Sequence, residues 1–253
     1  MNQHEMKYIL AKGDCHRFSA ENIVAVHPDA AQGCRFSLIA DKVKNRVVLK
    51  PHQRGVLMIR ERTLMIEQGT LSVFPANIQA LIKLQAFIDT ALQRNVVHQK
   101  TGAHFFSALN IKKGGNQKHF ERWLITINIL DVAHASPYLA LLRSSEHYWL
   151  IRYLLEHERD NLSLKALGEK YGVSVSHFRR LSRSALGNTV KEELCHWRLS
   201  RALLDLLEHE ETITDVAFKH GYASLSHFSN DVKTALGYSP RELKNKSLCD
   251  SEK

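Results

Sequence analysis

One segment of the chain returns, slightly changed, fifty residues later, and this repeat narrows the folds open to the sequence. Ser174–Phe178 reads SVSHF and Ser224–Phe228 reads SLSHF, and an Ala-Leu-Gly after each copy keeps the same offset. Gly172 and Gly221 lie 49 positions apart, so the second copy has one extra residue between this glycine and the shared serine. Solenoids need at least about three repeats. Two copies therefore indicate a duplicated module.

Each copy has the pattern of a helix-turn-helix, two short helices joined by a tight turn. The first copy predicts helices over 164–171 and 175–186, and the second predicts helices over 213–220 and 225–236. Glycines end these helices at three points, as C-cap glycines do. The expected N-caps are residues whose side-chain oxygens can accept backbone N–H groups: Ser163, Ser174, Thr212 and Ser224.

The second helix of the first copy has one apolar and one polar face. Phe178, Leu181 and Ala185 recur at spacings of three and four and are expected to face inward. The polar residues on the opposite face, here named the first stripe, are Ser176, Arg179, Arg180 and Arg183.

The second helix of the second copy repeats the pattern. The residues expected to pack inward are Leu225, Phe228, Val232 and Ala235. The outward residues, here named the second stripe, are Ser226, Ser229, Asn230 and Lys233. A polar stripe on one helix is usually solvated surface. Its presence on the second helix of two matching motifs favours contact with DNA.

The side chains of both stripes suit DNA recognition. Arginine can bind guanine O6 and N7 together, and asparagine can do the same with adenine N6 and N7. From Lys170 to Arg201 seven basic residues stand against two acidic ones, whereas from Glu208 to Lys246 five stand against six. The first motif is therefore expected to supply most of the attraction to phosphates.

A long helix is expected between the motifs, over 190–209, with an apolar stripe formed by Leu194, Trp197, Leu203, Leu204 and Leu207. Twenty helical residues span about 30 Å, close to the roughly 34 Å of one DNA turn. A connector of that length can hold two recognition helices in successive major grooves.

The N-terminal half has a different pattern, which predicts an α+β chain with a mixed N-terminal domain and an all-α C-terminal domain. Residues up to about Phe74 are expected to form short strands, for example at 35–39, 46–49, 56–59, 64–66 and 71–74, with a strand pair around Gln68-Gly69. Helices are expected over 76–94, 120–132 and 137–157. The predicted domains are 1–143, for regulation or partner binding, and 144–247, for DNA.

Composition argues against several other classes. No apolar run is long enough to span a membrane, and the N-terminus lacks a signal-peptide core. The four cysteines and 15 histidines show no zinc, redox or HExxH spacing, so no metal, cofactor or catalytic residue is expected. A reduced, cytoplasmic protein is expected. The net charge of +9 suits a polyanionic partner, yet residues 1–143 hold 19 basic and 10 acidic residues and account for all of it.

Residues from about Tyr148 to Lys246 resemble the DNA-binding domain of AraC/XylS-type regulators. The resemblance rests on Ile213–Ala217, Gly221–Ser224, His227–Ser229 and Leu236–Leu243. It implies two helix-turn-helix motifs joined by a long helix. It also implies base contacts from both stripes, through Ser176, Arg179, Arg180, Ser226, Ser229 and Asn230.

A narrower resemblance joins Leu139–Leu155, Tyr171–Ser174, His177–Leu181 and Ala223–Ser229 to the InvF/MxiE group of type III secretion regulators. It implies a virulence-gene activator that binds double-stranded promoter DNA, works with RNA polymerase and uses a secretion chaperone as coactivator. The sequence leaves the oligomeric state open.

Three other functions stay open from the sequence. An AraC-type regulator that responds to a small-molecule effector is the first, although the strand-rich part is short. The second is an enzyme, because some relatives carry a DNA-repair unit with four zinc-binding cysteines; only Cys15 and Cys34 lie in the N-terminal half. The third is a non-specific architectural DNA protein, which the near-neutral C-terminal half disfavours.

Overall fold

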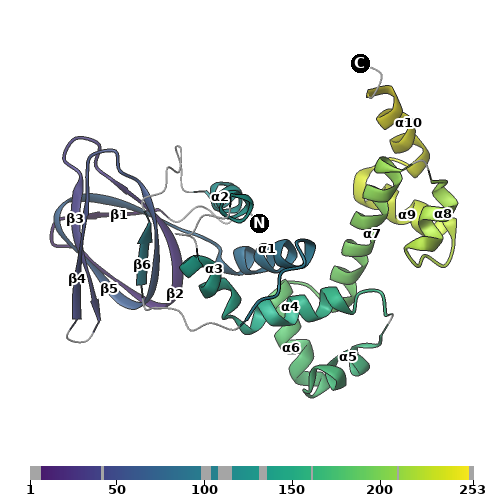
Figure 1. Cartoon of the computed structure of the whole chain (residues 1–253), viewed down its shortest axis with the longest axis horizontal. Coiled ribbons are helices and arrows are strands. Elements are labelled where there is room, and N and C mark those ends of the chain that lie inside the picture. Colours follow the sequence, from purple (N-terminus) through teal and green to yellow (C-terminus); the bar gives the residue numbers. More distant parts are fainter. Residues whose placement is uncertain are drawn as a thin grey trace. The chain divides into compact units, whose positions relative to one another are not determined.

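The computed structural model describes residues 7–40, 43–97, 104–107, 116–130, 136–160, 162–209 and 211–250 (Figure 1). The chain forms two compact units, Met1–Arg152 and Tyr153–Lys253. The N-terminal unit combines a six-stranded sheet with helices, and the described part of the C-terminal unit is helical. The predicted α+β class is confirmed. The sequence placed the domain boundary at Ser144, and the units divide nine residues later, inside helix α4.

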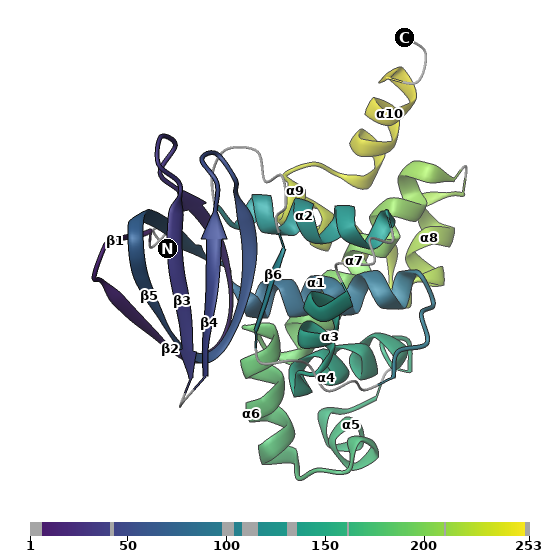
Figure 2. The same cartoon turned by 60° about the vertical axis from the view of Figure 1, so that its left-hand side comes forward.

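The sheet is built around one long strand. Its members are β1 (Tyr8–Ala11), β2 (Cys15–Pro28), β3 (Cys34–Ala40), β4 (Val43–Leu49), β5 (Gly55–Pro75) and β6 (His104–Ser107). Four strands pair with β5, and β4 pairs with β3. Val26 of β2 lies opposite both Gly55 and Val73, so the two ends of β5 meet at β2. The sheet therefore curls back on itself, as Figures 1 and 2 show.

The strand pair expected around Gln68-Gly69 is wrong, because the three strands expected between 56 and 74 are parts of the single strand β5. Gly69 has φ +80°, and a Cβ there would clash with the carbonyl oxygen of Gly33. Gly69 therefore lets β3 approach β5 closely, and β5 continues through this position without a turn. Strands β1 and β2 lie in the region expected to form strands, although the sequence gives no bounds for them, and β6 is not predicted.

The curled sheet encloses an apolar core. Fully buried side chains from β2, β3 and β5 fill it, among them Val24, Phe36, Leu38, Leu57, Ile59 and Leu64. Each such side chain contributes about 1.5–3 kcal/mol relative to full exposure. This burial explains why strands β2, β3 and β5 form without a strict apolar–polar alternation.

Four helices accompany the sheet: α1 (Ile78–Ala91), α2 (Gln117–Ile129), α3 (Ser136–Arg143) and α4 (Glu146–Glu156). The first two match the expected helices. The single helix expected over 137–157 is wrong, because the chain breaks at Ser144 and Ser145. The Ser144 hydroxyl donates to the Leu141 carbonyl at 2.7 Å, and the Ser145 hydroxyl accepts the His147 N–H at 3.2 Å. These local bonds end one helix and begin the next.

The C-terminal unit contains six helices in its described residues: α5 (Leu164–Tyr171), α6 (Val175–Leu186), α7 (Val190–Glu208), α8 (Ile213–Lys219), α9 (Leu225–Leu236) and α10 (Pro240–Asp250). All four expected N-caps accept a backbone N–H three residues on. Helices α5 and α6 lie toward one end of α7, and α8 and α9 lie toward the other (Figure 1).

Among the helices that the structure describes, none is long and apolar enough to cross a membrane.

Candidate nucleic-acid interface

Helix α6 presents the first stripe because its other face is anchored. The Ser174 hydroxyl accepts the His177 N–H at the start of the helix, and Gly187 ends it with φ +82°. Phe178 is fully buried, and Leu181 and Ala185 are at most 7% exposed. All four residues of the first stripe are exposed. The helix therefore has one fixed orientation, with three arginines directed at solvent.

The arginines of the first stripe are available for a ligand. Within the described residues, Arg179, Arg180 and Arg183 take part in no ion pair. The backbone N–H and the hydroxyl of Thr189 both donate hydrogen bonds to the carboxyl group of Glu192. These bonds lower the pKa of Glu192, and the charge of Arg183 lowers it further. Glu192 is thus engaged in the N-terminal capping box of α7. The three guanidinium groups keep their donors for an outside acceptor.

Helix α9 carries the second stripe, and here the predicted inward face is partly wrong. Phe228 and Val232 are fully buried, but Leu225 is 39% exposed and Ala235 is also exposed. The surrounding apolar cluster reaches α9 only at Phe228 and Val232. Three residues of the second stripe are exposed, and the fourth, Ser229, is half-buried.

Helix α7 joins the two motifs, but the expected apolar stripe is wrong in part. Leu204 and Leu207 are 55% and 45% exposed, and the buried side chains of this half of the helix are those of Leu199, Ala202 and Leu206. These three recur at spacings of three and four, one position out of step with the expected stripe. They pack against α8 and α9 in one cluster.

An ionic contact fixes α8 on α7. Asp205 accepts from Lys219 at 2.9 Å and from His220 at 2.8 Å. Hydrogen bonds from these two side chains lower the pKa of Asp205 to about 2. The carboxylate is therefore charged at neutral pH and holds the end of α8 in place, just before the turn that leads to α9.

A hollow of about 750 Å³ lies between the first stripe and the start of α9. It is lined by Arg179 and Arg183 of the first stripe, by Arg198 of α7, and by His227, which neighbours Ser226 of the second stripe. Side chains from α6 and from the start of α9 thus face the same concave side of the C-terminal unit. A duplex that runs along this side can reach both.

Sequence reasoning missed a group of residues beside α7. Glu158 and Arg159, in the turn after α4, lie together with Arg198 and Arg201 of α7. In the sequence, Arg198 and Arg201 count only toward the positive charge of the first motif. The pairing of Glu158 with Arg201, at 2.9 Å, joins residues 43 positions apart, and no local spacing marks it.

Metal-ligating residues are not gathered at this surface. Among the described residues, no group of three or more His, Cys, Asp or Glu side chains is arranged to hold a metal ion. Cys15, Cys34 and Cys195 are free thiols. The chemistry that the surface offers is that of hydrogen-bond donors and positive charge.

Comparison with known proteins gives matches over both parts of the chain. A helix-turn-helix domain model matches residues 167–246. Invasion protein InvF of Salmonella typhimurium is 38% identical over 195 residues, 76% of this chain and 90% of that protein. Transcriptional regulator MxiE of Shigella flexneri is 36% identical over 197 residues, 76% of this chain and 93% of that protein.

A third relative matches only the C-terminal part. The HTH-type transcriptional activator RhaS of Escherichia fergusonii is 30% identical over 95 residues, 38% of this chain and 34% of that protein. The matches to InvF and MxiE extend well beyond the two motifs into the N-terminal unit, as 195 aligned residues require. The chain thus belongs to the AraC/XylS family of DNA-binding transcriptional regulators, in the group that contains InvF and MxiE.

Proposed function

We propose that this protein activates transcription of type III secretion and effector genes by reading a two-part DNA site. The observation that carries the proposal is the pair of exposed stripes, each on the second helix of a helix-turn-helix. In this motif the second helix enters the major groove and its side chains contact base edges. The residues proposed to contact DNA are Ser176, Arg179, Arg180, Arg183, Ser226, Ser229, Asn230 and Lys233.

The length of α7 supports a site that spans two major grooves. Its 19 residues span about 28 Å, somewhat less than the roughly 34 Å between successive major grooves on one face of B-DNA. Because Arg179 and Arg183 of the first stripe and His227 of α9 line one hollow, a single chain is proposed to read a long asymmetric site.

The two motifs make unequal contributions. The stretch 170–201 has an excess of five positive charges and supplies most of the phosphate attraction. The stretch 208–246 has an excess of one negative charge, and Asp231 adjoins Asn230 on α9. The second motif therefore adds base contacts through Asn230. Lys233 is the basic residue of the second stripe that can contact a base or a phosphate.

The biological setting of the proposal comes from the relatives. One is named an invasion protein and another a transcriptional regulator, and this chain aligns with about nine tenths of each. A regulator of this group acts where the bacterial chromosome is, in the cytoplasm, and recruits RNA polymerase to its promoters.

We further propose that the N-terminal unit binds a type III secretion chaperone as coactivator. Residues 1–143 hold 19 basic and 10 acidic residues, an excess that the DNA-reading motifs do not use. An acidic protein surface is the partner that such an excess favours. The test is to titrate promoter binding of the full chain with and without candidate chaperones. Unchanged promoter binding and no complex with any of them would contradict this part.

Two substitutions test the base-reading role directly. Arg179→Ala and Arg180→Ala each remove a side chain that can grip guanine bidentately, and each is expected to cost about 1–3 kcal/mol on the cognate site. Gel-shift titration of the full chain measures this loss, on the promoter and on a scrambled duplex. Arg35→Ala, an exposed arginine of β3 in the N-terminal unit, is the matched control and keeps wild-type affinity. Wild-type promoter affinity in both stripe variants would overturn the assignment.

A further inference from the structure

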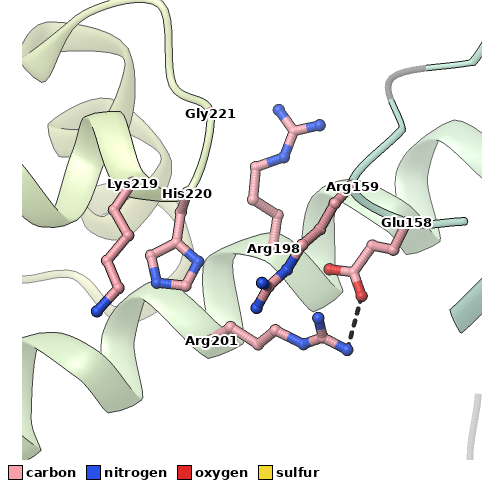
Figure 3. Close-up of a pocket in the computed structure, with 7 residues that line it drawn as sticks. All are labelled: Glu158, Arg159, Arg198, Arg201, Lys219, His220 and Gly221. Atoms are coloured by element: carbon pink, nitrogen blue, oxygen red, sulfur yellow. Dashed lines mark ion pairs between the residues drawn. The ribbon is translucent and has the colours of Figure 1, made fainter. Parts of the chain in front are cut away.

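A small basic hollow lies beside α7, outside both stripes (Figure 3). Its volume is about 100 Å³, and it is lined by the turn after α4, by α7 and by the end of α8. Sites for drug-sized ligands have volumes of about 300–1,000 Å³. This hollow, here named the arginine hollow, therefore admits only a small group.

The charges around the arginine hollow are not balanced. Lys219 and His220 are engaged with Asp205, as described above. Glu158 is the one carboxylate among the lining residues, and it pairs with Arg201 at 2.9 Å. Arg159 adds a further positive charge. Arg159 is exposed, and no carboxylate of the described residues lies within ion-pair distance of it.

Two of the three arginines are held in place before any ligand arrives. The side chain of Glu158 is 5% exposed, and it fixes the Arg201 guanidinium at the wall of the hollow. Arg198 lies over the ring of Tyr222, with 5.9 Å from the guanidinium carbon to the ring centroid. A planar guanidinium presents paired N–H donors that match two oxygens of a phosphate. Because its position is already fixed, little side-chain entropy is lost on binding.

The arginine hollow adjoins the larger hollow described above. It shares Arg198 and Glu158 with the larger hollow. That larger hollow is also lined by Arg179 and Arg183 of the first stripe and by His227 of α9. Along α7 the arginine hollow lies between the two motifs. A duplex that places one major groove at α6 and the next at α9 passes its backbone between them on this side.

We propose that the arginine hollow binds a phosphate of the DNA backbone between the two major grooves, and so positions the duplex for both stripes. This inference rests on the proposed function. Phosphate contacts fix the register of a protein on DNA without reading its sequence. The hollow thus gives a role to Arg198 and Arg201, which are basic residues of α7 and lie outside α6 and α9.

The experiment measures how the affinity of the full chain for DNA changes with salt. Each phosphate that is neutralised adds about 0.9 to the slope of log affinity against log salt concentration. Arg159→Gln is expected to reduce the slope by about this amount, equally on the promoter and on a scrambled duplex. Arg35→Gln removes the same charge from the N-terminal unit and leaves the slope unchanged.

A second variant is expected to strengthen binding, which loss of structure does not do. Glu158→Gln removes the negative charge that opposes a phosphate but keeps a side-chain oxygen that can accept from Arg201, so affinity for both duplexes rises several-fold. An unchanged slope in Arg159→Gln, or weaker binding in a folded Glu158→Gln, would overturn the inference. Loss of affinity for the promoter alone would also overturn it, because that pattern belongs to a base contact.

A third arm separates the DNA backbone from free phosphate as the ligand. The thermal midpoint of the full chain is measured in inorganic phosphate and in chloride at equal ionic strength. One outcome is that phosphate stabilises the wild type, that Arg159→Gln abolishes this stabilisation, and that Arg159→Gln has the salt slope of the wild type. This outcome assigns the hollow to free phosphate and refutes the backbone contact. If the wild type does not prefer its promoter to the scrambled duplex, the proposed function fails, and the slopes on the scrambled duplex still test the hollow.

Discussion

Single residues decide where the helices of the C-terminal unit begin and end. Ser163, Ser174, Thr212 and Ser224 cap the helices that the sequence predicts, because a short side-chain oxygen can reach an N–H three residues ahead. Such interactions are local, so the printed sequence reveals them. The pairing of Glu158 with Arg201 is not local, and it is found only in the fold.

Asp89 is the clearest case of a residue whose role depends on the whole N-terminal unit. It is fully buried in α1, and it accepts hydrogen bonds from Arg143 at 2.7 and 2.9 Å and from Tyr148 at 2.8 Å. Burial alone would raise the pKa of Asp89, but hydrogen bonds from Arg143, Gln85 and Tyr148 outweigh it and lower the pKa below 3.8. These partners come from α1, α3 and α4, so sequence spacing gives no sign of the network.

The network predicts how acid affects the N-terminal unit. A carboxyl group whose folded pKa is depressed contributes stability above its unfolded pKa, and this contribution is lost as pH falls through the folded value. Asp89→Asn is expected to cost about 3 kcal/mol at neutral pH, because it leaves Arg143 without its anion. Between about pH 5 and pH 3 the variant should lose less further stability than the wild type.

Chemical denaturation at several pH values, followed by a signal from the N-terminal unit, measures both effects. Asp160→Asn, an exposed aspartate of the C-terminal unit, is the control and should follow the wild type. If the free energy of unfolding falls equally with pH in Asp89→Asn and in the wild type, the buried carboxylate is not the source of the acid sensitivity.

Helices α6 and α9 show how far a sequence repeat predicts packing. The repeat correctly places both helices and their caps, and seven of the eight stripe residues are exposed. It wrongly buries Leu225 and Ala235, because burial depends on what covers each end of the helix. In the first copy Ala185 is 5% exposed, whereas the equivalent Ala235 is open to solvent.

The difference between the copies predicts unequal effects of two truncations on the same helix. Phe228→Ala removes a fully buried ring and is expected to lower the free energy of unfolding of the C-terminal unit by about 3–5 kcal/mol. Leu225→Ala, three residues earlier and 39% exposed, should cost less than about 1 kcal/mol. Denaturant titration of the two full-length variants compares them. Equal losses would mean that Leu225 is packed after all.

The sheet shows what element-level reasoning from sequence leaves out. The sequence gives no bounds for strands β1 and β2, and β5 was read as three strands. Gly33 and Gly69 are typical turn residues, yet here they let two strands approach closely. Whether a glycine marks a turn or a close contact depends on the neighbouring strand, which is far away in the sequence.

At the level of the chain, the two units differ in composition and in how well the sequence predicts them. The C-terminal unit was the more predictable, because its caps, glycines and stripes are all short-range signals. The N-terminal unit holds the charge excess, and its fold depends on long-range pairing around β5. In the proposed function, residues 153–253 read DNA and residues 1–152 bind a partner.

The central claim is that both stripes read one duplex, in adjacent major grooves. Missing-base interference, with the full chain on a promoter found by genome-wide binding, tests it most directly. The account predicts two clusters of required bases on one DNA face, with centres about one helical turn, 10–10.5 base pairs, apart. Arg179→Ala should abolish contacts in one cluster and Asn230→Ala in the other. A single cluster, or two clusters that respond to neither substitution, would contradict it.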